Sequence, residues 1–185
     1  MLAKLTRQLT WISCIMIFAT LAGCAFFVKE QTLPPKNLRS VKVDSNHALQ
    51  LVNNWRSKHK LPPVKLDTHL TIVSQEMATH IAKRDSLATP LHSSSSLQKR
   101  TQTPTYRSKA GAENLGAGYK TLEDAFIGWK NSKDHNKNLL NPYVTHMGIA
   151  LTVRDNGRYR YFWVMTLAAP YQSPTREIRI RRPGP

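Results

Sequence analysis

The sequence MGIALTVRDNGRYRYFWVMTLA, residues 147–168, decides the fold class of the chain. From Met147 to Val153 the large apolar residues recur at every second position, which is the periodicity of a β-strand. Asn156-Gly157 follows, and this residue pair is favoured at the centre of a type I′ hairpin turn. The return strand, Arg158 to Ala168, carries apolar residues on both faces, so we predict a central strand that is covered on both sides.

Four segments before this hairpin have helical features. The first two follow the capping residues Asp44 or Ser45 and Asp67, and each carries apolar residues along one helical face. These apolar stripes are Ala48, Leu51, Val52 and Trp55 in the first helix, and Leu70, Val73, Met77 and Ile81 in the second. We predict a third helix from Thr121 to Asn131 and a short fourth helix that ends at Leu140.

A segment rich in Ser, Thr and Pro, Thr89 to Tyr106, separates the second and third helices, and we predict it to be a long loop. Helices followed by a hairpin indicate an α+β fold. We expect the helices to pack on both faces of a small antiparallel sheet.

The N-terminal residues have the features of a cleaved secretory signal. Lys4 and Arg7 precede a predominantly apolar segment, Trp11 to Ala22, which is too short to span a bilayer. The segment ends at Leu21-Ala22-Gly23-Cys24, which resembles the bacterial lipoprotein box, so we predict cleavage before Cys24 and acylation of its thiol. The predicted organisation is a signal peptide (1–23), a tether (24–43), one globular domain (44–170) and a basic, Pro- and Arg-rich tail (171–185).

The chain is strongly basic, with 27 Lys and Arg residues against 11 Asp and Glu residues and a net charge of +16. Loss of Lys4 and Arg7 with the signal peptide lowers this to +14. Such a charge favours anionic partners, namely anionic lipid, lipopolysaccharide or a wall polymer. We expect no nucleic-acid partner, because the chain is predicted to be secreted and has no recognisable nucleic-acid-binding motif. Cys14 lies in the leader, so no disulfide is expected within the mature domain.

Three polar side chains are candidates for chemistry. Glu113 lies in the segment Ala112–Gly118, whose glycines predict a turn, and His92 lies in the predicted long loop. His135 follows the third helix. Two imidazoles and a carboxylate can hold a divalent metal, or can act without metal as a general base and its orienting partner. The common hydrolase signatures are absent. His146 precedes a strand and is interpreted as lying outside this site.

From about Asn46 to Pro170 the sequence resembles the CAP superfamily, also called SCP-like or pathogenesis-related-1-like domains. It is most similar to the bacterial branch. The residues that carry the resemblance are Val52-Asn53-Asn54-Trp55-Arg56, Leu66-Asp67-x-x-Leu70, His92, Ala112-Glu113-Asn114-Leu115 with Ala117-Gly118, Trp129-x-x-Ser132-x-x-His135-x-x-Asn138-Leu139-Leu140, Met147-Gly148-Ile149-Ala150 and Tyr161-Phe162-Trp163.

This resemblance implies a three-layer α-β-α sandwich with a cleft lined by His92 and Glu113. Relatives often add a second glutamate and a second histidine to this cleft, and some bind zinc or magnesium. In this chain the segment with the usual second histidine is absent, Ser132 stands about where the second glutamate would be, and His135 follows one helical turn later. The expected cleft residues are therefore His92, Glu113, Ser132 and His135, with Glu113 and His135 close together. The expected metal ligands, for zinc or magnesium, are His92, Glu113 and His135.

Three functions are compatible with the sequence. The first is a non-enzymatic envelope module that binds a small amphipathic or anionic ligand or a wall component. The second is a metal-assisted hydrolase that uses His92, Glu113 and His135. The third is a structural lipoprotein whose basic surface adheres to the envelope. Ala25 rather than Asp after Cys24 favours the outer membrane over the inner membrane, with the domain facing the periplasm.

Overall fold

The computed structural model describes residues 37–171. Its helices and strands, in chain order, are β1 (Leu38–Val41), α1 (Ser45–Lys58), β2 (Lys65–Leu66), α2 (Thr68–Arg84), α3 (Ser94–Thr101), β3 (Ser108–Ala117), α4 (Leu122–Asn131), α5 (Lys133–Leu139), β4 (His146–Arg154) and β5 (Tyr161–Pro170). The predicted signal peptide, the predicted acylation site Cys24, most of the tether and the basic tail after Tyr171 lie outside the described residues. Within residues 37–171 no helix has the length and apolar character needed to cross a membrane.

The strands of the described part form one sheet in the order β1-β4-β5-β3, all antiparallel, and the short strand β2 pairs in parallel with β4. Strand β5 therefore lies between β4 and β3. Its residues Phe162 to Ala169 are all buried, which confirms the prediction of a central strand covered on both faces.

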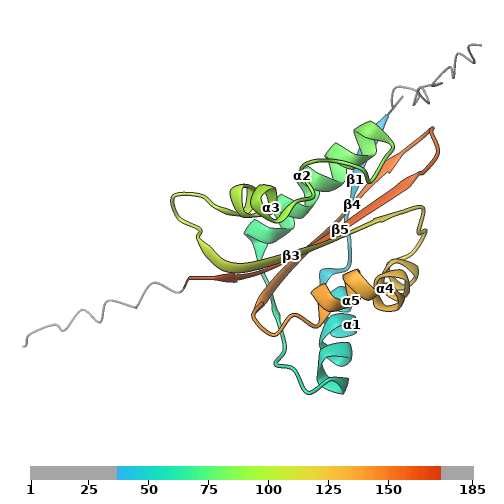
Figure 1. Cartoon of the computed structure of the whole chain (residues 1–185). Helices are drawn as coiled ribbons and strands as arrows, with labels where there is room; N and C mark the ends of the chain where they lie inside the picture. Colours follow the sequence, from blue (N-terminus) through green and yellow to red (C-terminus); the bar gives the residue numbers. More distant parts are fainter. Residues whose placement is uncertain (1–36, 172–185) are drawn as a thin grey trace, which may run out of the picture. The chain divides into compact units, whose positions relative to one another are not determined.

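Helices cover both faces of this sheet, as Figure 1 shows. On one face α1, α4 and α5 pack over a core that includes Val52, Trp129 and Trp163. On the other face α2 packs over a second core that includes Met77, Ile81 and Phe162, and α3 lies beside α2. The α-β-α sandwich is therefore confirmed.

The predicted helix starts are confirmed by their capping bonds. The Asp44 carboxylate accepts a hydrogen bond from the backbone N–H of His47 at the start of α1. The Asp67 carboxylate does the same for Leu70 at the start of α2. Such bonds satisfy backbone donors that have no partner within the helix, which is why these residues set where the helices begin.

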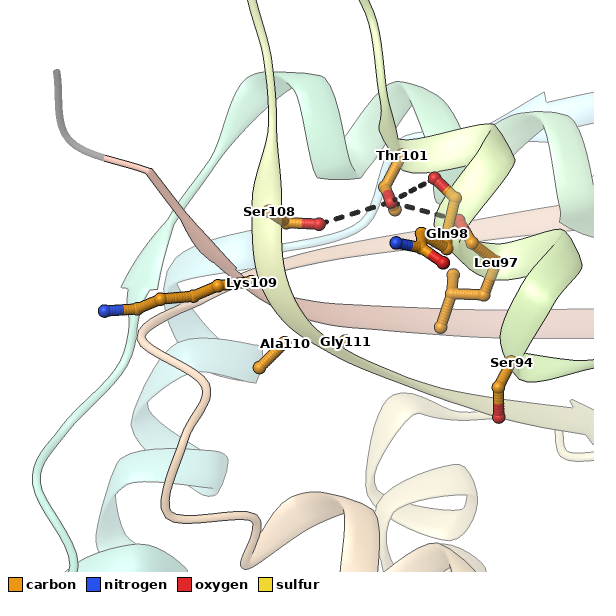
Figure 2. A pocket seen from close by; sticks show the side chains of 8 residues that line it. All are labelled: Ser94, Leu97, Gln98, Thr101, Ser108, Lys109, Ala110 and Gly111. Carbon is orange, nitrogen blue, oxygen red and sulfur yellow. Dashed lines mark hydrogen bonds between the residues drawn. The ribbon is translucent and has the colours of Figure 1, made fainter.

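Helix α3 corrects the prediction of a loop over residues 89–106. Ser93 caps this helix, and only Leu97 and Thr101 on its inner face are buried. Figure 2 shows α3 beside the first part of β3, where the Thr101 hydroxyl lies 3.5 Å from the Ser108 hydroxyl. A segment with a single large apolar residue has no apolar stripe, so the periodicity of its sequence does not predict a helix. The helix is stabilised by its packing against the rest of the domain.

Strands β1 and β3 were also missed. Leu38–Val41, which the sequence analysis assigned to the tether, forms strand β1 at the edge of the sheet. Glu113 lies in strand β3 and not in a turn, since the strand continues in register with β5 from Gly111 to Ala117. The glycines that suggested a turn lie within the strand or directly after it, where Gly118 has a positive φ of 86°.

The hairpin between β4 and β5 is confirmed, but its turn type is not. A type I′ turn needs positive φ at both central residues, whereas only Gly157 of the pair has one, 111°. The Arg154 N–H donates to the Arg160 carbonyl, so the loop is longer than two residues. Asp85, at the end of α2, holds this loop because its carboxylate accepts from the backbone N–H groups of Arg158 and Tyr159.

Candidate functional site

Glu113 is a buried carboxylate on strand β3. It is the cross-strand partner of Thr166 on β5, and its side chain points to the face of the sheet covered by α2 and α3. The residue is only 4% exposed. A buried carboxylate needs hydrogen bonds and an opposite charge to remain ionised at low cost, so its partners define what it can do.

Arg100 supplies that opposite charge. From the last turn of α3 its guanidinium donates two hydrogen bonds to Glu113, Nη1 to Oε1 at 3.1 Å and Nη2 to Oε2 at 2.8 Å. The Arg100 side chain is 15% exposed, and Nη2 also donates to the Leu91 carbonyl at 3.2 Å. This two-pronged, charge-assisted arrangement is the strongest way in which an arginine holds a carboxylate.

Arg100 was not among the site residues predicted from the sequence, because residues 89–106 were expected to form a loop. Once this segment is known to contain α3, the spacing Leu97-x-x-Arg100-Thr101 places Arg100 near the buried face of the helix, since residues three and four apart share one helix face. Leu97 and Thr101 are both buried, so Arg100 between them points inward as well.

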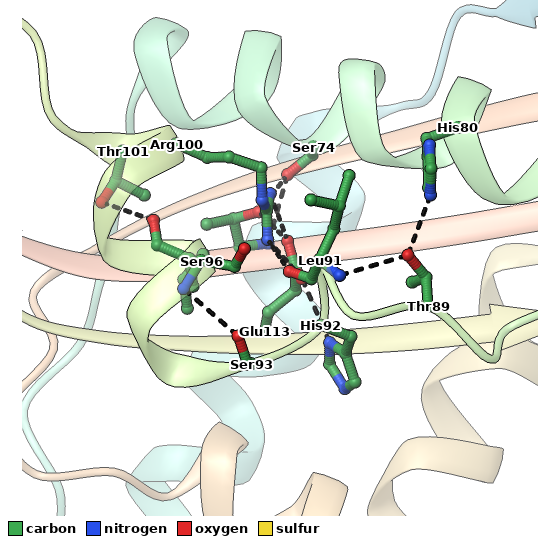
Figure 3. Close-up of polar contacts among 12 residues, drawn as sticks. Ser74, His80, Thr89, Leu91, His92, Ser93, Ser96, Arg100, Thr101 and Glu113 are labelled. Atoms are coloured by element: carbon green, nitrogen blue, oxygen red, sulfur yellow. Dashed lines mark hydrogen bonds and ion pairs between the residues drawn. The ribbon is translucent and has the colours of Figure 1, made fainter.

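His92 is the second group on Glu113, as the sequence predicted. Its Nδ1 donates to Glu113 Oε2 at 3.1 Å, so the tautomer with hydrogen on Nδ1 leaves Nε2 as a hydrogen-bond acceptor (Figure 3). The His92 side chain is 36% exposed while that of Glu113 is 2% exposed. His92 is therefore the part of this cluster that a ligand can reach.

A small pocket of about 180 Å³, called the cleft below, opens beside this cluster. The residues that line it are His92, Ser93, Ser94, Leu97, Gly111, Ala112, Glu113 and Asn138. Asn138 reaches the cleft from α5, on the opposite face of the sheet, and its amide donates to the Glu113 carbonyl at 3.1 Å and to the Asn114 side chain at 2.9 Å. The cleft thus lies at the free edge of β3, where both helical layers meet.

Ser132 and His135 do not line the cleft. Ser132 joins α4 to α5 and makes no side-chain capping bond. His135 is half-buried on α5, and its backbone carbonyl accepts from Asn114. Burial lowers the pKa of His135, and the nearby charge of His92 lowers it further. Among the described residues no hydrogen bond joins His135 to Glu113, and the carboxylate that we expected beside His135 instead binds His92 and Arg100.

The donor set does not fit the expected zinc or magnesium site. Within residues 37–171 no group of three His, Cys, Asp or Glu side chains lies close enough to hold a metal ion. Both oxygens of Glu113 already bind the Arg100 guanidinium, which places a positive charge where a metal would otherwise neutralise the carboxylate. We derive no chemical step through a metal.

The chain belongs to the CAP family, described as the cysteine-rich secretory protein family, whose profile matches residues 49–167. The fold is therefore that of a CAP domain of bacterial type.

Relatives and solved structures agree with this assignment. The uncharacterized protein YkwD of Bacillus subtilis (strain 168) is 29% identical over an alignment of 122 residues, which covers 60% of this chain and 43% of YkwD. The chain thus spans less than half the length of this curated relative. An extracellular SCP-domain protein from Bacillus anthracis str. Ames has a TM-score of 0.53 at 24% identity, covering 67% of this chain and 39% of that one. An outer surface protein from Borrelia burgdorferi has a TM-score of 0.59 at 16% identity, covering 72% of this chain and 98% of that one.

Proposed function

We propose that this chain is a bacterial envelope lipoprotein whose CAP domain binds a polar or anionic component of the envelope in the cleft, without catalysing a reaction. Two similar proteins carry the descriptions extracellular protein and outer surface protein, which supports a location outside the cytoplasm. The Leu21-Ala22-Gly23-Cys24 box supports attachment through an acylated Cys24, and Ala25 rather than Asp after it supports the outer membrane, with the domain facing the periplasm.

The observation that carries the proposal is the neutralisation of Glu113 by Arg100. Both oxygens of the Glu113 carboxylate accept hydrogen bonds from the guanidinium, at 2.8 and 3.1 Å, and the Glu113 side chain is only 2% exposed, so few of its acceptor positions remain for a ligand. Its role is to orient His92. The outer nitrogen of His92, the hydroxyls of Ser93 and Ser94 and the amide of Asn138 then form a set of hydrogen-bonding groups around the cleft.

The size of the cleft limits what enters it. At about 180 Å³ it is smaller than the roughly 300–1,000 Å³ of pockets that enclose a drug-sized ligand. One polar group of a larger molecule fits this space. A wall glycan or a wall peptide presents such groups, and the rest of the molecule would extend along the surface.

A titration with soluble wall fragments tests the proposal. Disaccharide-peptides released from peptidoglycan are added to the isotope-labelled full chain in neutral detergent micelles, and amide chemical shifts are followed. We expect saturable shifts at Gly111, Ala112 and Asn138 in the wild type, and their loss in His92→Ala. His59→Ala, which removes an exposed histidine from the end of α1, is the matched control and should bind as the wild type does. Saturable binding by His92→Ala with wild-type affinity would refute the assignment of the cleft.

A further inference from the structure

We propose that a second pocket, at the end of the sheet where β4 begins, binds the anionic groups of the same wall polymer. This inference rests on the proposed binding function and names the chemistry of the ligand. The polymer would carry carboxylate or phosphate groups, which the second pocket recognises, while one of its uncharged polar groups occupies the cleft.

The second pocket, called the basic pocket below, has a volume of about 460 Å³. Its lining residues are Pro63, Lys65, Lys109, Thr145, His146, Ala169, Pro170 and Tyr171. The three basic residues come from three strands of one sheet, in which β2 pairs with β4, and β5 separates β4 from β3. Lys65 of β2 is the parallel partner of His146 on β4, and Lys109 follows Ser108, the partner of Pro170 on β5.

No described residue neutralises the positive charge of this pocket. Among the described residues that line it none is acidic, and neither Lys65 nor Lys109 makes an ion pair within residues 37–171. The His146 ring is held in place by a 2.9 Å hydrogen bond between its Nδ1 and the Thr145 hydroxyl. Two unpaired ammonium groups and an imidazole around one hollow attract oxyanions.

Polar groups connect the basic pocket to the cleft. A groove of about 250 Å³ between α3 and β3 shares Lys109 with the basic pocket, and it shares Ser94, Leu97 and Gly111 with the cleft. Figure 2 shows Ser108 pointing toward α3 and Lys109 pointing away from it. The residues of the three hollows therefore follow one another along β3, and an extended ligand that contacts all three would cross β3 at Lys109, from the side that faces α3 to the other side.

The position of the chain ends favours a wall polymer over the surface of the anchoring membrane. The described chain begins beside the far end of β4, where Leu38 pairs with Arg154, whereas the basic pocket lies at His146. Eight residue steps of β4 separate these ends by roughly 27 Å. A chain anchored at its N-terminus can thus present the basic pocket away from the bilayer.

Co-sedimentation with purified peptidoglycan sacculi tests the inference on the full chain in neutral detergent. The charge-reversal variant Lys65→Glu/Lys109→Glu should bind sacculi about tenfold more weakly than the wild type, because a favourable field becomes a repulsive one. The control Lys120→Glu/Lys133→Glu makes the same change of net charge at exposed lysines outside the three hollows and should bind as the wild type does. Circular dichroism verifies that each variant folds. If Lys65→Glu/Lys109→Glu does not fold, Lys65→Gln/Lys109→Gln replaces it, and its loss of binding to sacculi should be intermediate.

Treated sacculi and vesicles identify the source of the anions. Amidation with a carbodiimide removes carboxylate charge, and hydrogen fluoride removes phosphodiester-linked polymers, so one of these treatments should abolish the lysine-dependent binding. Equal binding of the Lys65→Glu/Lys109→Glu and control variants would overturn the inference. So would retention on phosphatidylglycerol vesicles alone, since it would assign the pocket to a membrane. If the lysine variant loses binding and His92→Ala does not, the cleft assignment is overturned and the basic pocket is retained. If His92→Ala loses binding and the lysine variant does not, the basic pocket is overturned and the cleft assignment is retained.

Discussion

Replacing Arg100 by alanine removes the guanidinium that neutralises Glu113. The variant loses two hydrogen bonds to the carboxylate, of 2.8 and 3.1 Å, and a third to the Leu91 carbonyl. Glu113 stays where it is, since β3 is paired along its length with the central strand β5. A carboxylate whose side chain is 2% exposed is then left without its charge partner.

The cost follows from the burial of the pair. Removing one member of a buried ion pair destabilises a protein by about 3–5 kcal/mol. We expect about 3 kcal/mol, at the lower end, because His92 and Thr166 still bind Glu113 and because Arg100 is 15% exposed in its side chain. Glu113→Gln keeps the shape and one acceptor, and we expect a loss of about 2 kcal/mol. The double variant should be more stable than the sum of the two losses predicts, by about 2 kcal/mol, since the second change removes the unpaired charge.

Urea denaturation followed by tryptophan fluorescence measures these four proteins, with the free energy of unfolding extrapolated to water. Arg84→Ala, which removes an exposed arginine from α2, is the control for loss of a positive charge and should have little effect. A loss below about 1 kcal/mol in Arg100→Ala, or additive losses in the double variant, would refute the view that this pair is a buried structural unit.

Three further predictions concern the core, the anchor and the response to pH. Trp163→Ala should lower the free energy of unfolding by about 3–5 kcal/mol and Trp55→Ala by clearly less, because Trp163 is buried and Trp55 only half-buried; urea denaturation decides, and equal losses would contradict the burial. Cys24→Ser should abolish labelling by a radioactive fatty acid and release the protein from membranes, whereas an unlabelled wild type would disprove acylation. Burial lowers the pKa of His135 and of His80 below the ordinary 6.5, so each binds its proton more tightly in the unfolded chain. Stability should therefore fall as the pH drops below about 6.5, and less steeply in His80→Gln/His135→Gln; identical slopes in denaturation between pH 7 and 5 would contradict this.

The sequence predicted those elements whose residues carry a local signal. Helices α1, α2 and α4 have a capping side chain and an apolar stripe, and β5 is apolar on both faces. Strand β3 has neither feature, because the buried positions Glu113 and Asn114 are polar and are satisfied by partners from distant helices. The type I′ prediction failed for the same reason, since Asp85 from α2 determines the loop.

The site was predictable only in part. His92 and Glu113 belong to recognisable patterns and line one cleft, as expected, but the close contact of Glu113, which was expected with His135, is with His92, whose Nδ1 lies 3.1 Å from Glu113 Oε2. Arg100 lies in a chain with 27 basic residues, and nothing local distinguishes a buried arginine from a solvated one. Lys109 and His146 are distant in sequence and meet at one hollow only because β3 and β4 both flank β5.

The central claim is that the cleft binds its ligand without a metal, because Arg100 already neutralises Glu113. Isothermal titration of the full chain with soluble wall fragments, first in EDTA and then with added zinc, tests this claim most directly. For the wild type we predict the same dissociation constant for the fragments in both conditions. The heat released on adding zinc should be the same for the wild type and for Glu113→Gln. His92→Ala should bind no fragments. Fragment binding that appears only after zinc is added, and that Glu113→Gln abolishes, would contradict the account.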